Sequence, residues 1–300
     1  MFKQRKIITA DKNHYGNELS AEESYVINNK GTEKPFTGEY TDLFDTGVYI
    51  CRKCSNPLYF SDSKFHSGCG WPSFDQEIEY AVIRIPDKDG QRTEIICSYC
   101  RGHLGHIFEG ENFTIKNIRH CVNSISMKFV KMNPACLKKA YFAGGCFWGV
   151  EYFFEKLSGI IAVFSGYSGG TTDYPLYKKV VTSKTGHAET IEVVYDSSKI
   201  SYNELTEFFF EIHDFTQINR QGPDIGTQYR SEIFYNNDEE KKIVLKIIEF
   251  LKNAGYKPAT KLSPFKKFWV AEDYHQNYYF NNKSEPYCHS RKKIFTDLSL

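Results

Sequence analysis

The sequence predicts two domains of different class, a mostly-β domain followed by an α+β domain. A chain of 300 residues is long enough for two domains that each bury a core. Short runs of alternating polar and apolar residues fill the first half, whereas strand-like and amphipathic helical segments mix in the second. No repeat relates the halves, so the chain is a fusion of unlike units. We expect the first domain at residues 1–131, a linker at 132–139 and the second domain at 140–300.

The first half contains five strand-like segments and one helical segment. The predicted helix is residues 19–26, and the predicted strands are residues 47–51, 58–60, 79–86, 92–97 and 121–131. In the last of these, Cys121, Asn123 and Met127 fall on one face because side chains alternate along a strand. We therefore expect Cys121 to lie at the end of a packed apolar face.

The second half reads as mixed strands and helices after the Pro134-containing linker. Residues 141–143 form a short predicted strand that ends in Gly144-Gly145, and a helix follows at 147–157. Ser201 and Glu204 form a capping box that opens a second helix, and a third runs from Asp238 to a stop at Gly255. Residues 187–195 and 229–235 alternate as strands do.

Charge and hydropathy exclude several classes of partner. The 38 basic residues nearly match the 37 acidic ones, and neither half has the basic excess expected of a nucleic-acid or anionic-membrane binder. No stretch approaches the roughly 18 apolar residues of a membrane span. The basic residues at 1–8 are followed by no apolar segment, so we expect the chain as given to stay in the cytoplasm.

Four of the nine cysteines form two Cys-x-x-Cys pairs, Cys51 with Cys54 and Cys97 with Cys100. Four thiolates are the tetrahedral set that structural zinc prefers, and they leave no coordination position open for chemistry. In a cytosolic protein such cysteines favour a metal over disulfides. The alternative is four unpaired buried cysteines. Because zinc ribbons of transcription factors carry the same pairs, this motif names no function.

Three further segments of the first half resemble the methionine sulfoxide reductase B family. Residues 66–74 read HSGCGWPSF, residues 102–108 read GHLGHIF, and residues 118–124 read IRHCVNS. With the two zinc pairs they make five motifs in the family's order, and the resemblance covers residues 15–131. The family often has another histidine in the strand before the second zinc pair, but residues 80–92 contain none.

The resemblance implies a thiol chemistry for this domain that needs no flavin or haem. Cys121 would attack the sulfoxide sulfur as a thiolate, which the neighbouring Arg119 would favour. Trp71 would pack against the substrate methyl group, and His106 and Asn123 would lie near the sulfoxide oxygen. Cys69 would then attack the sulfenic acid on Cys121, forming a disulfide for a reductant to open. Taken alone, Trp71 could be a core residue and His106 a structural one.

A second reactive-cysteine setting opens the α+β domain. Residues 143–149 read AGGCFWG, which puts Cys146 at a turn from a strand into a helix. Backbone amides and the helix dipole at such a turn stabilise a thiolate, and the glycines allow the sharp bend. Phe147 and Trp148 offer an aromatic box for an S-methyl group. A buried structural cysteine is the alternative.

With residues 185–190 (TGHAET) and 219–231 (NRQGPDIGTQYRS), this motif resembles methionine sulfoxide reductase A over residues 138–293. The resemblance implies that Glu189 protonates the sulfoxide oxygen, that Tyr177 and Tyr229 hydrogen-bond to it, and that Asp224 orders the pocket. The sequence departs from the family at two positions: Phe215 stands where proline is usual, and Ser183 where glycine is usual.

Cys288, in the polar C-terminal segment 285–289 (EPYCH), is the predicted resolving cysteine for Cys146. We expect this tail to follow the last apolar elements and to be mobile enough to reach the nucleophile. Cys136 in the linker then has no partner, and it is either a spectator or a backup resolving cysteine.

Together the two resemblances predict an enzyme that reduces both epimers of methionine sulfoxide, free or in oxidised proteins. The A-type domain would take the S epimer and the B-type domain the R epimer, with thioredoxin as electron donor. Three other functional classes are alternatives: a zinc-dependent redox sensor, a general thiol–disulfide oxidoreductase and an interaction module. A sensor or module needs no substrate pocket, and an oxidoreductase normally has its catalytic cysteines two positions apart, unlike Cys121 and Cys146.

Overall fold

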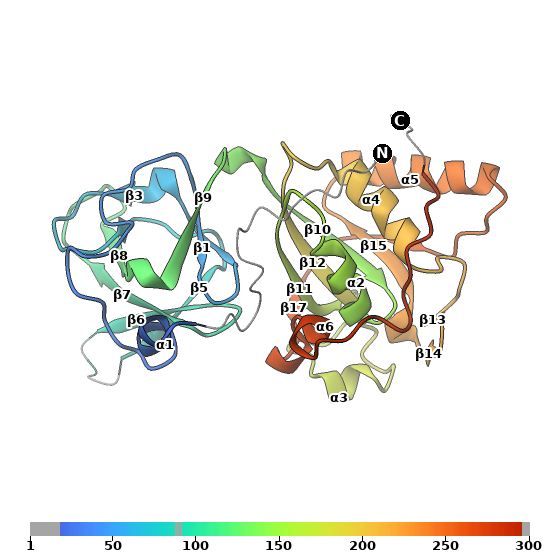
Figure 1. Cartoon of the computed structure of the whole chain (residues 1–300), viewed down its shortest axis with the longest axis horizontal. Helices are drawn as coiled ribbons and strands as arrows, with labels where there is room; N and C mark the ends of the chain where they lie inside the picture. Colours follow the sequence, from blue (N-terminus) through green and yellow to red (C-terminus); the bar gives the residue numbers. More distant parts are fainter. Residues whose placement is uncertain (1–18, 88–89, 91, 296–300) are drawn as a thin grey trace. The chain divides into compact units, whose positions relative to one another are not determined.

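The computed structural model describes residues 19–87, 90 and 92–295, and it divides between Cys136 and Leu137 into two compact units (Figure 1). Each unit is described by itself. Residues 1–8, which carry the prediction about a leader, lie outside the described part of the chain.

The first unit contains one helix and two antiparallel sheets. Helix α1 (Ala21–Ile27) begins at a capping box formed by Ser20 and Glu23. One sheet has the strand order β2-β1-β9 and the other the order β3-β4-β8-β7-β6-β5. The bounds are β1 Gly47–Cys51, β2 Pro57–Phe60, β3 Lys64–Phe65, β4 Ser73–Phe74, β5 Val82–Pro86, β6 Thr93–Cys97, β7 His103–Glu109, β8 Ile118–Val122 and β9 Met127–Lys131, with 3-10 turns η1 Ser61–Ser63 and η2 Ser124–Ser126. The mostly-β prediction is confirmed for the described residues of this unit.

Aromatic side chains fill the core of the first unit. Tyr59 stacks on Phe74 with ring centroids 4.3 Å apart, and Tyr49 meets Phe74 edge-on at 5.0 Å. Since Tyr49 and Tyr59 belong to one sheet and Phe74 to the other, these contacts join the two sheets. All three rings are fully buried.

The prediction of one strand over residues 121–131 is wrong. The chain leaves strand β8 after Val122, makes turn η2, and enters the other sheet as β9. The carboxylate of Glu33 holds this turn by accepting the amides of Ser124 and Ile125. Because a turn separates them, Cys121 and Met127 do not share a strand face. Glu33, which accepts the amides of this turn, is about ninety positions away in the sequence.

The second unit is an α+β domain built on one six-stranded sheet of order β16-β15-β10-β12-β11-β17, in which only the β15–β16 pair is parallel. The strands are β10 Leu137–Gly144, β11 Ile160–Ser168, β12 Ala188–Asp196, β15 Ser231–Tyr235, β16 Lys261–Pro264 and β17 Phe268–Val270, with a small hairpin of β13 Arg220–Gln221 and β14 Asp224–Ile225. The helices are α2 Phe147–Phe154, α3 Tyr177–Val180, α4 Tyr202–Ile212, α5 Asp238–Asn253 and α6 Tyr278–Asn281, and the 3-10 turns are η3 Pro134–Cys136, which precedes this unit, η4 Thr227–Tyr229 and η5 Asp273–His275.

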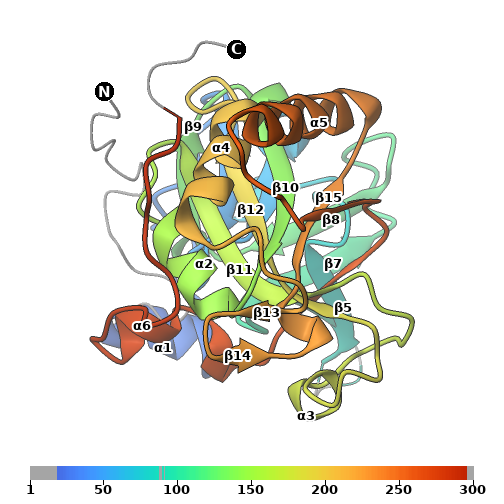
Figure 2. The same cartoon turned by 90° about the vertical axis from the view of Figure 1, so that its right-hand side faces the viewer.

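Alternation along β10 divides the second unit into two apolar layers. Ala140 and Phe142 face the core that also contains α2 and α4, which cover one face of the sheet (Figure 2). Tyr141 and Ala143 face the opposite way, where Phe265 stacks on Tyr141 with ring centroids 3.7 Å apart. The buried sheet fixes the end of β10, and it is there that the chain turns into α2 at Cys146.

Local signals in the second half are confirmed, and their bounds shift. Ser201 and Glu204 form the predicted capping box at α4. Helix α5 begins at Asp238 as expected, capped by Asn237. Strand β10 is longer than the predicted 141–143, and its first residue, Leu137, falls inside the segment expected as linker. Helix α2 ends at Phe154 rather than at residue 157.

The C-terminal segment is not the loose polar tail that we expected. Phe295 is buried in the core of the second unit, and Ile294 packs against the same core. The Glu211 side chain on α4 accepts hydrogen bonds from the amides of both residues and from the guanidinium of Arg291. The segment around Cys288 is therefore tied down on its C-terminal side. Among the described residues, no helix is long and apolar enough to cross a bilayer.

Candidate active sites

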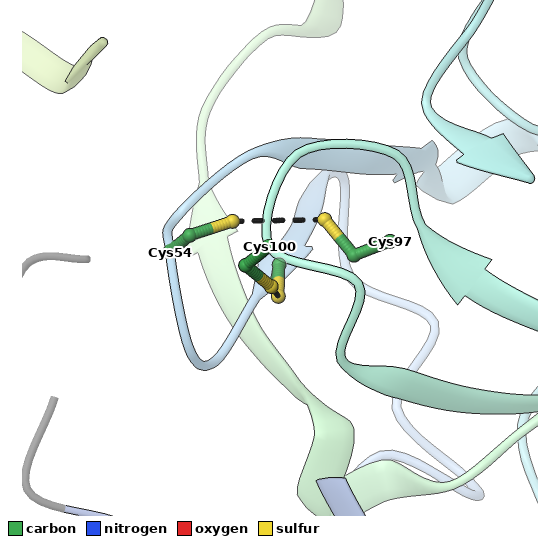
Figure 3. Close-up of side chains that lie close together, drawn as sticks. Cys54, Cys97 and Cys100 are labelled. Carbon is green, nitrogen blue, oxygen red and sulfur yellow. Dashed lines mark hydrogen bonds between the residues drawn. The ribbon is translucent and has the colours of Figure 1, made fainter. Parts of the chain in front are cut away.

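Four cysteine side chains converge in the first unit from two turns. Cys51 ends β1 and Cys54 lies in the turn after it, and Cys97 and Cys100 have the same places at the end of β6. All four are buried, their sulfurs lie within 4.8 Å of one another, and the Cys51–Cys100 and Cys54–Cys97 sulfurs are 3.6 Å apart. Figure 3 shows Cys54, Cys97 and Cys100 of this cluster, with the contact between Cys54 and Cys97 dashed. Sulfurs about 2.3 Å from a tetrahedral zinc ion would be about 3.8 Å apart. The donor set and its spacing therefore fit zinc.

Two more cysteines of this unit meet where a loop passes over strand β8. Cys121 lies in β8, and Cys69 lies in the loop before β4, with 3.8 Å between their sulfurs. Ser73 of β4 pairs with Cys121 across the ladder, which fixes the position of the loop end. Gly68 and Gly70 flank Cys69 with φ angles of 72° and 93°, a conformation that glycine adopts without strain. Because disulfide formation would require only a small movement, the two thiols form a candidate redox pair.

The two thiols of this pair differ in acidity. A hydrogen bond with Cys121 and another from the Ser67 hydroxyl, 3.0 Å away, lower the pKa of Cys69 to about 4. The hydrogen bond with Cys69 and burial raise the pKa of Cys121, while the charge of Arg119 lowers it. Cys69 is therefore the more acidic thiol of the pair. Arg119 lowers the pKa of Cys121, as predicted, but the hydrogen bond with Cys69 and burial raise this pKa by more.

A cavity of about 110 Å³ opens beside Cys121. Four of the residues predicted for this site line it, namely Trp71, His106, Cys121 and Asn123, together with Thr32, Arg92, Gly105 and Phe108. Its size suits a small apolar group such as a thioether end. Arg119 does not line the cavity. Its guanidinium forms two hydrogen bonds to Glu111 and lies over the Phe108 ring, 4.5 Å from the centroid, so it supports the wall from behind.

Hydrogen bonds to distant segments hold the cavity walls. Asn123 donates to the Leu104 carbonyl (3.0 Å) and accepts the Glu33 amide (3.0 Å). The indole of Trp71 donates to the Glu33 carbonyl (3.1 Å). The segment after α1, which the motifs did not single out, therefore fixes both residues.

Hydrogen bonds to Asp87 join two of the residues that line the cavity, His106 and Arg92. His106 Nε2 lies 2.8 Å from a carboxylate oxygen of Asp87, and the same oxygen accepts a hydrogen bond from Arg92 at 2.8 Å. Both partners come from the 80–92 region, which lacks the histidine that the family often has there. Arg92 and Asp87 are thus site residues that the motif comparison missed, because only the β5–β6 connection places them against β7.

The second unit brings its predicted residues together at the end of β10. Cys146 is the residue before α2, and its sulfur, the Cys288 sulfur and an Asp224 carboxylate oxygen all lie within 4.8 Å of one another. The hydrogen bond with Cys288, burial and the charge of Glu189 raise the pKa of Cys146, and the Trp148 amide lowers it. The helix start alone therefore does not make Cys146 a thiolate in the reduced pair.

Glu189 is a fully buried carboxyl group beside this cysteine. It lies on β12, and the Phe147 amide donates to it at 3.1 Å. Burial raises its pKa to about 8, with a further contribution from the charge of Asp224. At neutral pH it is therefore mostly protonated and is able to donate a proton.

Aromatic residues lie near Cys146 and Glu189. Tyr177 and Tyr229 share a hydrogen bond, and the charge of Glu189 acts on both. Trp148 stacks on Tyr278 with centroids 3.6 Å apart, and its indole donates to His275 at 3.1 Å.

Sequence reasoning missed His275 in the second unit. This histidine is 1% exposed and contacts the rings of Phe147 and Tyr177, and burial lowers its pKa to about 4, so it is neutral. The only sequence signal was its position in an aromatic-rich stretch near the C-terminus.

Comparison with known families agrees with the two-site geometry. Residues 138–299 match the model of the family described as peptide methionine sulfoxide reductase, and residues 19–131 match the SelR domain, the B type of this reductase. The chain belongs to the peptide methionine sulfoxide reductase family. It is therefore an oxidoreductase of the methionine sulfoxide reductase class, with a B-type domain followed by an A-type domain.

Relatives of the A-type domain are closely similar to this chain. The peptide methionine sulfoxide reductase MsrA of Nautilia profundicola is 49% identical over 152 residues, which is 51% of this chain and 88% of the relative. That of Saccharolobus solfataricus is 50% identical over 153 residues, 51% of this chain and 86% of the relative. The crystal structure of reduced Mxr1 from Saccharomyces cerevisiae aligns with a TM-score of 0.51 and 40% identity, covering 54% of this chain and 96% of Mxr1.

Proposed function

We propose that this reductase repairs both epimers of methionine sulfoxide, free or in oxidised proteins, the A-type domain acting on the S epimer and the B-type domain on the R epimer. The observation that carries this proposal is the presence of two separate close thiol pairs, Cys69 with Cys121 and Cys146 with Cys288, one in each unit. A sulfoxide sulfur is a stereocentre, so one pocket fits the methyl group and oxygen of only one epimer. These reductases are known to divide the work in this way, one enzyme for each epimer.

In the A-type site, Cys146 is the proposed nucleophile and Glu189 the proposed acid. The Cys146 sulfur attacks the sulfoxide sulfur while the protonated Glu189 gives its proton to the oxygen. The protonated oxygen then moves from the substrate sulfur to the Cys146 sulfur, so that the substrate S–O bond and the transient S–S bond both break, methionine leaves and Cys146 is a sulfenic acid. The thiol proton of Cys146 restores the acid form of Glu189. Methionine sulfoxide is reduced by two electrons and Cys146 is oxidised by two. Tyr177 and Tyr229 hydrogen-bond to the oxygen, Asp224 helps to order the pocket, and Phe147 and Trp148 contribute apolar surface.

In the B-type site, Cys121 is the proposed nucleophile and Cys69 the resolving cysteine. Cys69, whose sulfur lies 3.8 Å from that of Cys121, accepts the Cys121 proton as Cys121 attacks. His106, which shares a hydrogen bond with Asp87, delivers a proton to the oxygen, while Asn123 and Trp71 shape the cavity, and Arg119 favours the charged form of Cys121. Cys69 then displaces water from the sulfenic acid and forms the disulfide.

The proposed reductant for both disulfides is thioredoxin, and the proposed ion at the four-cysteine cluster is zinc in a structural role. The thiolates of Cys51, Cys54, Cys97 and Cys100 would hold the ion and fill its coordination sphere, so it would support the fold of the first unit. The family assignment supports a role in protein repair, and the proposed location of this role is the cytoplasm.

Single-cysteine variants assayed on separated epimers test the assignment. We expect Cys121→Ser to abolish turnover of the R epimer and to retain that of the S epimer, and Cys146→Ser to do the reverse. The measurement is methionine released from each epimer of a sulfoxide peptide with thioredoxin and its reductase. If either substitution removes both activities, or neither, the division of labour is wrong.

A further inference from the structure

His289 of the A-type site contacts both the resolving cysteine, Cys288, and the backbone of Gly144 at the end of β10. Its imidazole is 6% exposed, its Nδ1 atom is 3.0 Å from the Cys288 sulfur, and its Nε2 atom is 2.7 Å from the Gly144 carbonyl oxygen. The ring lies against the backbone of Gly149, where a Cβ atom would come within 2.2 Å of Nδ1. The last glycine of the AGGCFWG motif therefore leaves the space that this ring occupies.

The hydrogen bonds of His289 determine its tautomer. A carbonyl oxygen only accepts, so Nε2 must carry the hydrogen that bonds to Gly144. In the neutral ring the remaining nitrogen, Nδ1, is then an acceptor, and it faces the Cys288 thiol. The arrangement resembles the nucleophile–base–orienting-group relay of cysteine and serine enzymes, with a backbone carbonyl as the third group.

Cys288 needs a base in the resolving step. In the reduced pair, the interactions with Cys146 and with His289 lower the pKa of Cys288 to about 6. Once Cys146 has become a sulfenic acid, its thiol no longer takes part. His289 Nδ1 is then a neighbouring acceptor for the Cys288 proton, and the imidazolium that results stabilises the thiolate at the moment when Cys288 must attack.

We propose that His289 is the general base that activates Cys288 for disulfide formation, an inference that rests on the proposed roles of Cys146 and Cys288. The Cys288 thiol gives its proton to Nδ1, and the sulfur uses the freed electron pair to form the S–S bond with Cys146. The S–O bond of the sulfenic acid breaks, and the departing hydroxide takes the proton from His289 and leaves as water. Cys288 is oxidised and the sulfenic sulfur is reduced, so no outside reactant is needed.

Other titratable groups face this pair from several elements and bear on its pH dependence. They are Cys146 at the start of α2, Glu189 on β12, Asp224 on β14, His213 after α4, and Tyr279 and Tyr287 of the C-terminal segment. Asp224 raises the pKa of Cys288, so it opposes the proposed effect of His289.

Single-turnover experiments on the full chain test the proposal. The Cys121→Ser background removes B-type turnover, and one sulfoxide peptide is mixed with reduced enzyme in the absence of reductant. Methionine release reports attack by Cys146, whereas loss of free thiols and trapping by dimedone report disulfide and sulfenic acid. We expect His289→Gln, whose amide can still donate to Gly144, to keep the burst of about one methionine per site. Disulfide formation should slow by about a hundredfold, because general base catalysis contributes on that order, and sulfenic acid should accumulate.

A pH profile separates the base from a structural role. A thiol without a base ionises by itself near its ordinary pKa of about 8.5, so the deficit of His289→Gln should shrink between pH 7 and pH 9. The matched control is Glu207→Gln, an isosteric change at a buried titratable group on α4 that bonds to Asn203, and it should form the disulfide within about twofold of the parent. Rates are referred to the methionine burst, so unfolded molecules do not contribute.

The outcomes distinguish this inference from the proposed function. Wild-type disulfide rates in His289→Gln, or a deficit that does not change with pH, would overturn the role of His289. In Cys288→Ser we expect the methionine burst without the disulfide. A Cys146 disulfide formed at the parent rate in that variant would instead overturn the assignment of Cys288. The roles of both His289 and Cys288 require that Cys146→Ser lose the methionine burst.

Discussion

The Glu189 carboxyl group is 1% exposed and receives one hydrogen bond, from the Phe147 amide. Removal from water disfavours the carboxylate more than this single bond favours it, so the pKa rises to about 8. The same group in water would be ionised at neutral pH and would be a poor acid. The shift therefore gives the A-type site a proton donor close to the developing oxyanion.

Substituting Glu189 by Gln removes the proton while preserving an acceptor for the Phe147 amide. We expect the rate of methionine release in a single turnover to fall by about 10²–10⁴-fold, the usual contribution of a positioned acid. In the parent enzyme the acid form is the active one, so this rate should decline as pH rises through about 8. The variant should lack that decline. The measurement is rapid-quench methionine release between pH 6 and pH 9.5 in the Cys121→Ser background.

Glu151 provides a matched control because it is also fully buried and burial raises its pKa to about 8. It accepts hydrogen bonds from backbone amides of Asn277 and Tyr278 rather than facing the cysteine pair. Glu151→Gln should keep the decline above pH 8. If Glu189→Gln reacts at the parent rate, or keeps the parent pH profile, Glu189 is not the acid.

Other site residues depend on contacts that no local pattern reveals. Trp71 and Asn123 were predicted from their motifs, but the segment that fixes them, at Glu33, is about 40 and 90 residues away. Asp87 and Arg92 became visible only when β5 and β6 were paired. The cysteines, in contrast, were found because their chemistry is tied to short spacings and neighbouring glycines.

At the scale of elements, the C-terminal segment shows how a single side chain can position a reactive tail. Glu211, at the end of α4, is 3% exposed. Besides the bonds to Arg291, Ile294 and Phe295, its backbone carbonyl accepts the amide of Lys292 at 2.7 Å. These bonds hold the chain just after Cys288 and His289, so the reach of Cys288 is set by α4 as well as by its own loop.

Truncation of Glu211 to Ala should release this anchor. Two amides and a guanidinium lose their buried acceptor, which we expect to cost about 2–3 kcal/mol of unfolding free energy in the second unit. The measurement is urea unfolding followed by the burst of methionine at Cys146. Arg291→Ala is the comparison, because it keeps both amide bonds and removes only a partly exposed ion pair, so it should cost about 1 kcal/mol or less.

Equal unfolding free energies for these two variants would contradict the anchor. Disulfide formation between Cys146 and Cys288 should also slow in Glu211→Ala, whereas methionine release should not, since the anchor lies on the resolving side of the site.

Element boundaries were predictable where a local cap sets them and not elsewhere. The capping box at Ser201 and the start of α5 at Asp238 follow from side chains within three residues. The break between β8 and β9 does not, because the Glu33 carboxylate imposes it from another segment. The docking of the tail likewise depends on Glu211, about eighty residues upstream. At Ser183 the backbone has a φ angle of 59°, which explains why glycine is usual at that position in the family.

At the scale of the whole molecule, each of the two units has its own pair of close thiols, and among the described residues the two sites are built from separate sets of side chains. The cavity beside Cys121 is lined by residues 32–123, all in the first unit, and the residues around Cys146 lie between positions 146 and 289, all in the second. Each unit also has its own means of stabilisation. The second has a large aromatic core, whereas the first gathers four cysteines from two turns.

Metal removal should therefore affect the two units differently. In the first unit, the turns after β1 and β6 are joined by the four thiols, and burying them without an ion leaves four polarisable groups with few partners. Structural zinc contributes directly to folding free energy, on the order of 10 kcal/mol in small domains.

We expect Cys51→Ser, or treatment with a strong chelator, to release one zinc ion per chain and to unfold the first unit. Calorimetry should show loss of one transition, and R-epimer turnover should disappear. The transition of the second unit and S-epimer turnover should remain within about twofold of the parent. Cys136→Ser is the matched control, since Cys136 is the last residue of the first unit and is not one of the four clustered cysteines, and it should retain the metal and both transitions. If Cys51→Ser keeps its zinc and its first transition, the cluster is not the structural metal site. If metal loss abolishes S-epimer turnover as well, the two units are not independent.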